Sequence, residues 1–164
     1  MKSISHAKEL ITNVSYSLIF CFLSEYFLVS PEKFYLELDI DFPVIPFYFY
    51  PLIHRLSFLL YGICAYRVCS DQKCLNDANY KKGVYIIFFF SLLSAFSVPV
   101  LFFNLKLFFL TLLMILMTLI FSSVIVLYGF KNNKPAFFMS SVFFATNIYF
   151  FLFCISVIKN NVFG

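Results

Sequence analysis

His54 and Arg55 are the residues of this chain best suited to chemistry, because they lie side by side within a long apolar stretch. A neutral imidazole is a common metal ligand and proton carrier. A charged side chain at membrane depth is costly, so it usually lines a cavity, pairs with an opposite charge or reaches the interface. Arg55 could therefore hold an acidic group of a ligand, extend to the interface, or pair with a nearby acid. The nearby acids are Glu25, Glu37, Asp39 and Asp41.

His54 also belongs to an aromatic stripe. The stripe consists of Tyr50, His54, Phe58 and Gly62. Steps of four residues place these side chains on one face of a helix. Three rings above a glycine make a flat wall, which can either pack against a neighbouring helix or line a pocket. The spacing alone favours packing.

The composition is typical of an integral membrane protein. Of the 164 residues, 62% are hydrophobic and 12% are charged, against roughly 25% charged residues in soluble domains. The net charge of +4 is accounted for by basic loops beside a membrane, so we expect no nucleic-acid partner. The five cysteines are odd in number and lack C-x-x-C spacing, which favours buried packing over disulfides or a zinc site. The N-terminal segment has spanning length and no small-residue cleavage site, so we expect it to be retained.

The fold class expected is all-α, a single domain with five transmembrane helices. The segments that reach the roughly 20 apolar residues needed to cross a membrane are 10–29, 44–68, 84–103, 105–130 and 135–158. Short connectors predict an antiparallel bundle. Prolines in the first loop, residues 30–45, predict an irregular cap over a pocket and a helix that begins near Pro46. Basic residues gather on the side of the N-terminus, which predicts that this terminus lies inside.

The stretch from Phe34 to Gly62 resembles the signature region of the translocator protein family, the TspO/MBR or tryptophan-rich sensory proteins. The positions that fall on this signature in register are Phe34, Tyr35, Leu38, Pro46, Tyr48, Tyr50, His54, Phe58 and Gly62. VPVLFF in the third span and FFATN in the fifth are also similar to family motifs. The chain departs from the family in having no tryptophan, and Ser91 stands where the family has glutamine.

This resemblance implies a five-helix protein that binds a tetrapyrrole, such as porphyrin or haem, or a sterol, for sensing or transport. The ligand-binding residues expected are Phe34, Tyr35, Pro46, Tyr48, Tyr50, His54, Arg55, Phe58, Ser91 and Ala145. Aromatic rings suit a flat ligand, since each ring contact contributes about 0.5–1.5 kcal/mol beyond burial. His54, which stands at a family tryptophan, could instead ligate a haem iron. We expect no required cofactor, no resident metal and no catalysis, since porphyrin breakdown depends on tryptophans that this chain lacks.

Two functions remain open at this point. The first is a translocator-like protein in a bacterial inner (plasma) or mitochondrial membrane. Its partners would be the lipid membrane, a small hydrophobic ligand and, as one option, a second copy of the chain. The second is a membrane subunit or assembly partner that has kept the bundle, lost the ligand and acts through helix contacts. Saturable ligand binding distinguishes the two.

Overall fold

A computed structural model describes residues 2–28, 31–38, 43, 45–71 and 78–162, and the regular structure in these residues is entirely helical. The five long helices are α1 (Lys2–Tyr26), α3 (Tyr50–Cys69), α5 (Ala78–Pro99), α6 (Phe108–Asn132) and α7 (Lys134–Val162). Three shorter elements are α2 (Pro31–Glu37), the 3-10 turn η1 (Phe47–Phe49) and the π-helical turn η2 (Val100–Asn104). The all-helical class expected from the sequence is confirmed for this part of the chain.

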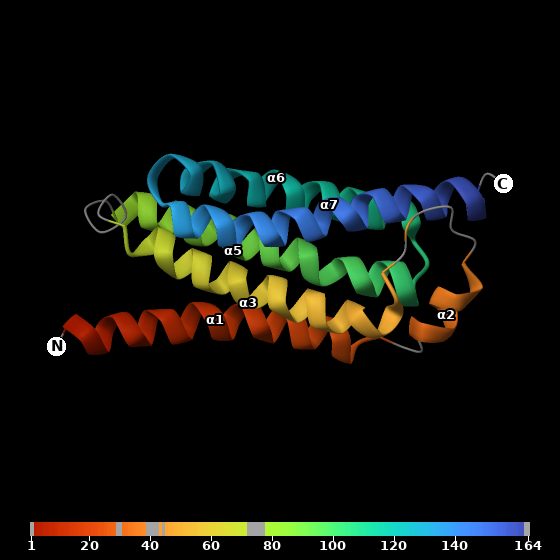
Figure 1. The fold of residues 1–164 in the computed structure, drawn as a ribbon, viewed down its shortest axis with the longest axis horizontal. Helices are drawn as coiled ribbons and strands as arrows, with labels where there is room; N and C mark the ends of the chain where they lie inside the picture. Colours follow the sequence, from red (N-terminus) through yellow and green to blue (C-terminus); the bar gives the residue numbers. More distant parts are fainter. Residues whose placement is uncertain (1, 29–30, 39–42, 44, 72–77, 163–164) are drawn as a thin grey trace.

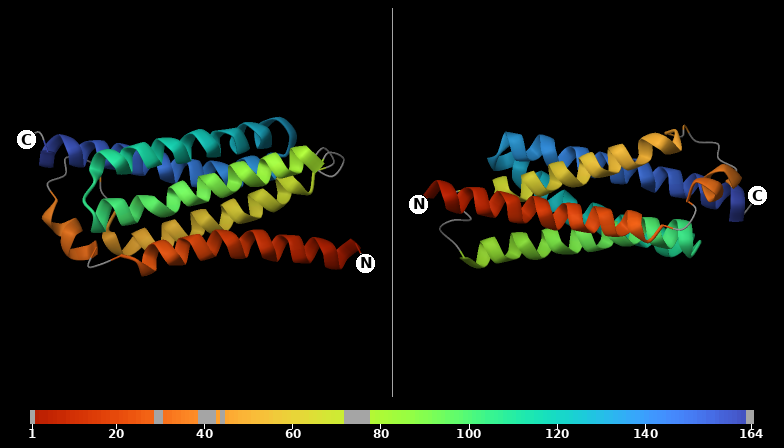
Figure 2. Two further views of the ribbon diagram at one scale, coloured as in Figure 1. Left: turned by 180° about the vertical axis from the view of Figure 1, so that it is seen from behind. Right: turned by 90° about the horizontal axis from the view of Figure 1, so that it is seen from below.

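The long helices form an antiparallel bundle, with the two termini at opposite ends (Figure 1). Helix α1 packs against α3 and α5, α7 packs against α3 and α6, and α6 packs against α5, so the five helices close a ring. The left view of Figure 2 shows the bundle from behind, with α1 and α6 on opposite sides. The junction between the end of α1 and the start of α3 lies at the same end of the bundle as the C-terminus.

Prolines set the start of α3 and the end of α5. The backbone N–H of Phe49 donates to Pro46 O at 2.9 Å, which forms η1, and α3 follows with Pro51 in its first turn, where a missing N–H costs no intrahelical bond. Helix α3 therefore begins one turn after Pro46. Pro99 ends α5, and the chain widens into η2, where Leu105 N–H donates to Val100 O at 3.3 Å.

Close contact between α1 and α3 depends on Gly62. A Cβ atom at this position would lie 3.0 Å from the carbonyl oxygen of Asn13, the Cα of Val14 and the Cβ of Ser17. The Ser17 hydroxyl donates to the carbonyl oxygen of Phe58 at 2.5 Å. Small residues allow such close approach where apolar lipid provides no hydrophobic drive between helices. The α1–α3 pair is therefore held in a narrow register.

Four helices in the described part of the chain are long and apolar enough to cross a membrane. They are α3, α5 continued through η2, α6 and α7. This is the pattern of a membrane-embedded protein. Helix α1 is as long as α6, at 25 residues each, but it does not belong to this set. It carries polar residues along its length, among them Glu9, Asn13 and Glu25. Of the five membrane spans expected from the sequence, four therefore correspond to helices of spanning length and hydropathy.

Helix α2 lies at the end of the bundle, in the loop for which the sequence predicts an irregular cap (Figure 1). Phe34 anchors it. The Phe34 ring contacts those of Phe102 and Phe103 edge-on, at centroid distances of 5.9 and 6.1 Å, and stacks on Phe108 at 6.3 Å. Of the rest of the expected cap, residues 30, 39–42 and 44, and with them Asp39 and Asp41, lie outside the described residues.

Candidate functional site

The aromatic stripe of α3 is largely internal. Tyr50 and His54 stack at a centroid distance of 5.4 Å, and His54 and Phe58 follow at 4.7 Å. His54 is 5% exposed and Phe58 is 2% exposed. Below them Gly62 meets α1. Most of the stripe therefore packs within the bundle, and Tyr50, at the N-terminal end of α3, is the stripe residue that lines the cavity described below.

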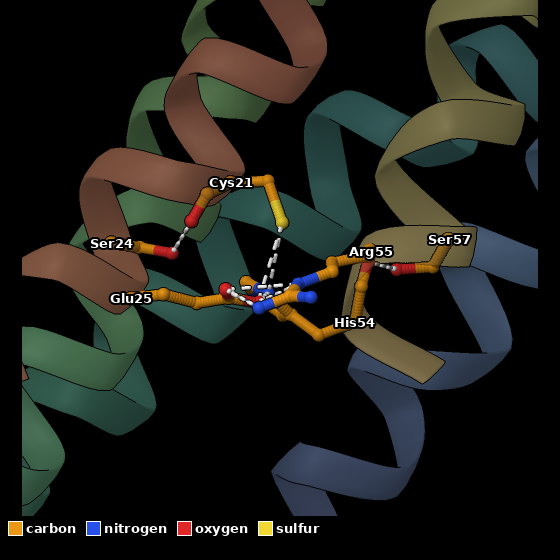
Figure 3. A network of polar contacts seen from close by, with 6 residues as sticks. All are labelled: Cys21, Ser24, Glu25, His54, Arg55 and Ser57. Carbon is orange, nitrogen blue, oxygen red and sulfur yellow. Dashed lines mark hydrogen bonds and ion pairs between the residues drawn. The ribbon is translucent and has the colours of Figure 1, made fainter. Parts of the chain in front are cut away.

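His54 and Arg55 meet the last turns of α1 in one polar cluster (Figure 3). Glu25 binds Arg55 through both oxygens, with Nε at 3.1 and 3.0 Å and Nη2 at 2.7 Å from Oε2. Nδ1 of His54 lies 3.7 Å from Oε1 of Glu25 and 3.3 Å from Sγ of Cys21. The same sulfur lies 3.8 Å from Oε1 of Glu25. Sulfur, nitrogen and oxygen donors from two helices thus converge on one point.

Helical spacing explains why these side chains meet. Cys21 and Glu25 are four residues apart on α1 and share a face, which is turned towards the first turns of α3 (Figure 3). The neighbouring serines are occupied elsewhere, because Ser24 Oγ donates to Cys21 O at 2.7 Å and Ser57 Oγ donates to His54 O at 2.8 Å. Neither hydroxyl competes for the cluster.

Arg55 is partnered rather than alone. Its planar guanidinium matches a carboxylate in a two-point contact, the strongest geometry for such a pair. The Glu25 side chain is 16% exposed and the Arg55 side chain is 52% exposed, so the pair sits at the edge of the bundle. The guanidinium carbon also lies 5.5 Å from the ring centre of Phe22. Of the acids considered from the sequence, Glu25 is therefore the one that pairs with Arg55.

A cavity of about 240 Å³ lies beside the cluster, between α3 and α7. Its lining consists of Ile45, Tyr50, Ile53, Phe103, Ala145, Thr146, Tyr149, Phe150 and Phe153. The lining is mostly apolar and aromatic, and the cavity is partly open. At one edge of the cavity, Tyr149 joins α7 to the segment before α3. Its hydroxyl accepts a hydrogen bond from the N–H of Ile45 at 2.9 Å and donates one to Pro43 O at 3.4 Å.

The structure separates the ligand-binding residues expected from the sequence into groups. Tyr50 and Ala145 line the cavity, and His54 and Arg55 belong to the polar cluster. Tyr48, with 72% of its side chain exposed, does not line this cavity. The remaining positions fall elsewhere or are not described. Pro46 is exposed, Phe34 packs against η2 and α6, Phe58 is internal, and the side chain of Tyr35 lies outside the described residues.

Ser91, expected in the pocket, is fully buried on α5 instead. Its hydroxyl and that of Tyr61, which is also fully buried, have no hydrogen-bond partner among the described residues. Ser91 does not line the cavity. Its position therefore fits packing between helices better than ligand contact.

Two features of the site were not predicted. Cys21 was assigned to packing, although its spacing from Glu25 is visible in the sequence. The aromatic residues of α7 that line the cavity, Tyr149, Phe150 and Phe153, were also missed. Cys21 could have been found from the Cys-x-x-x-Glu spacing of α1. The role of the α7 aromatic residues depends on the rotation of α7 against α3, which the sequence does not show.

Compared with known proteins, the chain matches no family model and no curated sequence. The functional argument therefore rests on the cluster and the cavity.

Proposed function

We propose that this chain is a five-span, translocator-like membrane protein that binds a flat hydrophobic ligand in the cavity between α3 and α7. The observation that carries the proposal is the cavity itself, whose lining includes the rings of Tyr50, Phe103, Phe150 and Phe153. Ligand sites are typically concave and apolar, with few polar groups. The resemblance of Phe34 to Gly62 to the translocator signature points to the same region of the fold.

Helix α1 is the proposed fifth span. Its 25 residues extend about 37 Å at about 1.5 Å per residue, enough to cross a hydrocarbon core about 30 Å thick. It runs beside α3 and α5 along the bundle (Figures 1 and 2). Its two acids are partnered: Glu9 pairs with Lys81 at 2.8 Å and Glu25 pairs with Arg55 at 2.7 Å. Paired charges that face the bundle are compatible with a spanning helix.

The proposed orientation places the N-terminus inside and the cavity near the outer face. Basic residues concentrate at the N-terminal end of the bundle. They include Lys8, Arg67, Lys81, Lys82, Lys131 and Lys134. The opposite end carries Lys33, Lys106 and Lys159 together with Glu32 and Glu37 of α2. This asymmetry follows the rule that basic loops stay inside, and fusions of a topology reporter to each terminus test it.

A tetrapyrrole is the ligand class that we propose first, with a sterol second. The cavity, at about 240 Å³, is below the roughly 300–1,000 Å³ of sites that enclose a drug-sized ligand. A large flat ligand would therefore insert one edge among the rings and extend through the open side. His54 is an unsuitable axial ligand for haem, because its 5% exposure leaves no room for a macrocycle at its nitrogens. Stacking, rather than iron ligation, is the proposed mode.

The test is a Soret-band titration of the full-length protein in detergent with protoporphyrin IX. Ala145→Phe places a ring in the cavity, and Val142→Phe, on the same helix but outside the cavity lining, is the matched control. We expect saturable binding that Ala145→Phe weakens at least about tenfold, equivalent to about 1.4 kcal/mol, while Val142→Phe leaves it unchanged. Both variants keep the chain free of tryptophan, so tyrosine emission remains an independent reporter.

Two results would overturn this assignment. Equal weakening in both variants would place the porphyrin on the lipid-facing surface. The absence of saturable binding of protoporphyrin IX, haem and cholesterol alike would favour the second function, a membrane subunit that acts through helix contacts. Co-purification of other membrane proteins with the full-length chain would then be the expected observation.

A further inference from the structure

We infer that Cys21, Glu25 and His54 form a binding site for a divalent transition-metal ion, with Zn²⁺ the best match. Sγ, Oε1 and Nδ1 form a triangle with sides of 3.3, 3.8 and 3.7 Å, and all three atoms are ligand atoms within 4.8 Å of one another. A point about 2.1 Å from all three atoms exists at the centre of this triangle, close to zinc bond lengths of about 2.0–2.2 Å to nitrogen or oxygen and about 2.3 Å to sulfur. The donors need almost no movement to hold an ion.

The donor chemistry selects the class of ion. Thiolate and imidazole favour zinc, copper and iron over magnesium and calcium, which prefer oxygen ligands. Cysteine, histidine and a carboxylate are the three ligand types of protein zinc sites. With three protein ligands, a zinc ion held here would keep one coordination position for water. The site therefore belongs to the three-ligand class.

Glu25 can serve the metal and Arg55 at once. Oε1 faces Cys21 and His54, whereas Oε2 makes the shortest contact with Arg55, at 2.7 Å from Nη2. Metal-bound carboxylates are commonly oriented by a further hydrogen bond of this kind. Arg55 thus acts as a positioning residue that fixes the carboxylate and compensates its charge.

Burial and access are both compatible with a bound ion. Cys21 and His54 are buried, at 0% and 5% exposure, whereas the Glu25 side chain is 16% exposed. An ion can therefore approach along the edge of the bundle where Glu25 and Arg55 reach the surface. Once bound, it would cross-link the last turns of α1 to the first turns of α3. Holding the ion requires neither a residue that lines the ligand cavity nor a bound porphyrin.

The experiment uses the full-length protein in detergent, stripped with a chelator and then titrated with Zn²⁺ and, separately, with Co²⁺ as a spectroscopic substitute. We expect one Zn²⁺ per chain by elemental analysis and a thiolate-to-cobalt charge-transfer band in the near ultraviolet. Cys21→Ala should abolish the band. Replacing a residue that only orients a metal ligand typically weakens metal affinity roughly 10–100-fold. Because His54 and Glu25 are proposed as direct ligands, His54→Gln and Glu25→Gln should each weaken Zn²⁺ binding by more than this.

Matched controls come from the same chain. Cys154→Ala removes another buried cysteine, on α7, and His6→Gln removes the other histidine; both should retain the ion and the band. The wild-type cobalt spectrum does not depend on any variant folding correctly. The inference is overturned if the wild-type protein binds no stoichiometric Zn²⁺, if its cobalt complex lacks the thiolate band, or if Cys154→Ala removes the band and Cys21→Ala does not.

Discussion

Replacing Gly62 with alanine should loosen the contact between α1 and α3. The new Cβ atom would lie 3.0 Å from backbone atoms of Asn13 and Val14. Backbone atoms of a packed helix cannot rotate away as a side-chain tip can, so the two helices must separate. Gly83, on α5, provides a matched control, because a Cβ at that position meets nothing within 4 Å.

The expected magnitude follows from two opposing effects. Alanine favours a helix over glycine by about 0.8–1.0 kcal/mol, and this gain applies at both positions. Overpacking costs about 1–3 kcal/mol, and this cost applies only at Gly62. Gly62→Ala should therefore be less stable than Gly83→Ala by about 1–3 kcal/mol, and Gly83→Ala should be slightly more stable than the wild type.

Unfolding in mixtures of a mild detergent and dodecyl sulfate, followed by circular dichroism, measures this difference. Far-ultraviolet spectra of both variants before unfolding check that each begins as the same helical bundle. If Gly62→Ala proves as stable as Gly83→Ala, α1 does not pack on α3 in the register described, and the geometry of the Cys21, Glu25 and His54 cluster loses its support.

Three further substitutions test other contacts. Phe143→Ala removes a fully buried ring that stacks on Tyr61 at 4.1 Å, and the same unfolding assay should show a loss of about 3–5 kcal/mol. Tyr149→Phe removes the acceptor of the Ile45 N–H; the expected loss is about 0.5–1.5 kcal/mol, and amide hydrogen exchange at Ile45 should become faster. Gly129→Ala would place a Cβ 2.6 Å from the backbone nitrogen of Phe137, so thermal unfolding should show that it destabilises the protein more than Gly62→Ala.

The sequence predicted the start of α3 well because the constraint there is local. Pro46 and Pro51 restrict the backbone of their own neighbourhood, so the helix can begin only near them, and α3 begins at Tyr50. The sequence also predicts the end of this span, at residue 103, close to the end of η2 at Asn104, but the change from α5 to the π-helical turn at Pro99 was not predicted. Helix α2 was missed because its seven residues are too few to show a helical period, although the Ser-Pro-Glu sequence at 30–32 is a typical helix start.

The partners of His54 and Arg55 could not be predicted in the same way. Arg55 had several acids within reach along the chain, and the choice of Glu25 depends on how α1 is rotated and shifted against α3. That register is set in part by Gly62, whose contact with Asn13 and Val14 is not visible in a single helix. The contact between Cys21 and His54 depends on the same register, so the sequence analysis treated Cys21 as a packing residue. The spacing of four residues between Cys21 and Glu25 was the one local sign of the cluster.

Tyr50 connects the proposed metal site to the proposed ligand cavity. Its ring stacks on His54 at 5.4 Å and meets the ring of Phe150, which also lines the cavity, edge-on at 5.2 Å. A porphyrin edge that moved Tyr50 would uncover His54, and an ion that fixed His54 would restrict Tyr50. Linkage requires such an effect to be equal in both directions, so Zn²⁺ must change the affinity for porphyrin by the same factor as porphyrin changes that for Zn²⁺. Titrations of each ligand in the presence of the other measure this factor, and a factor of one would mean that Tyr50 keeps its place when the cavity is filled.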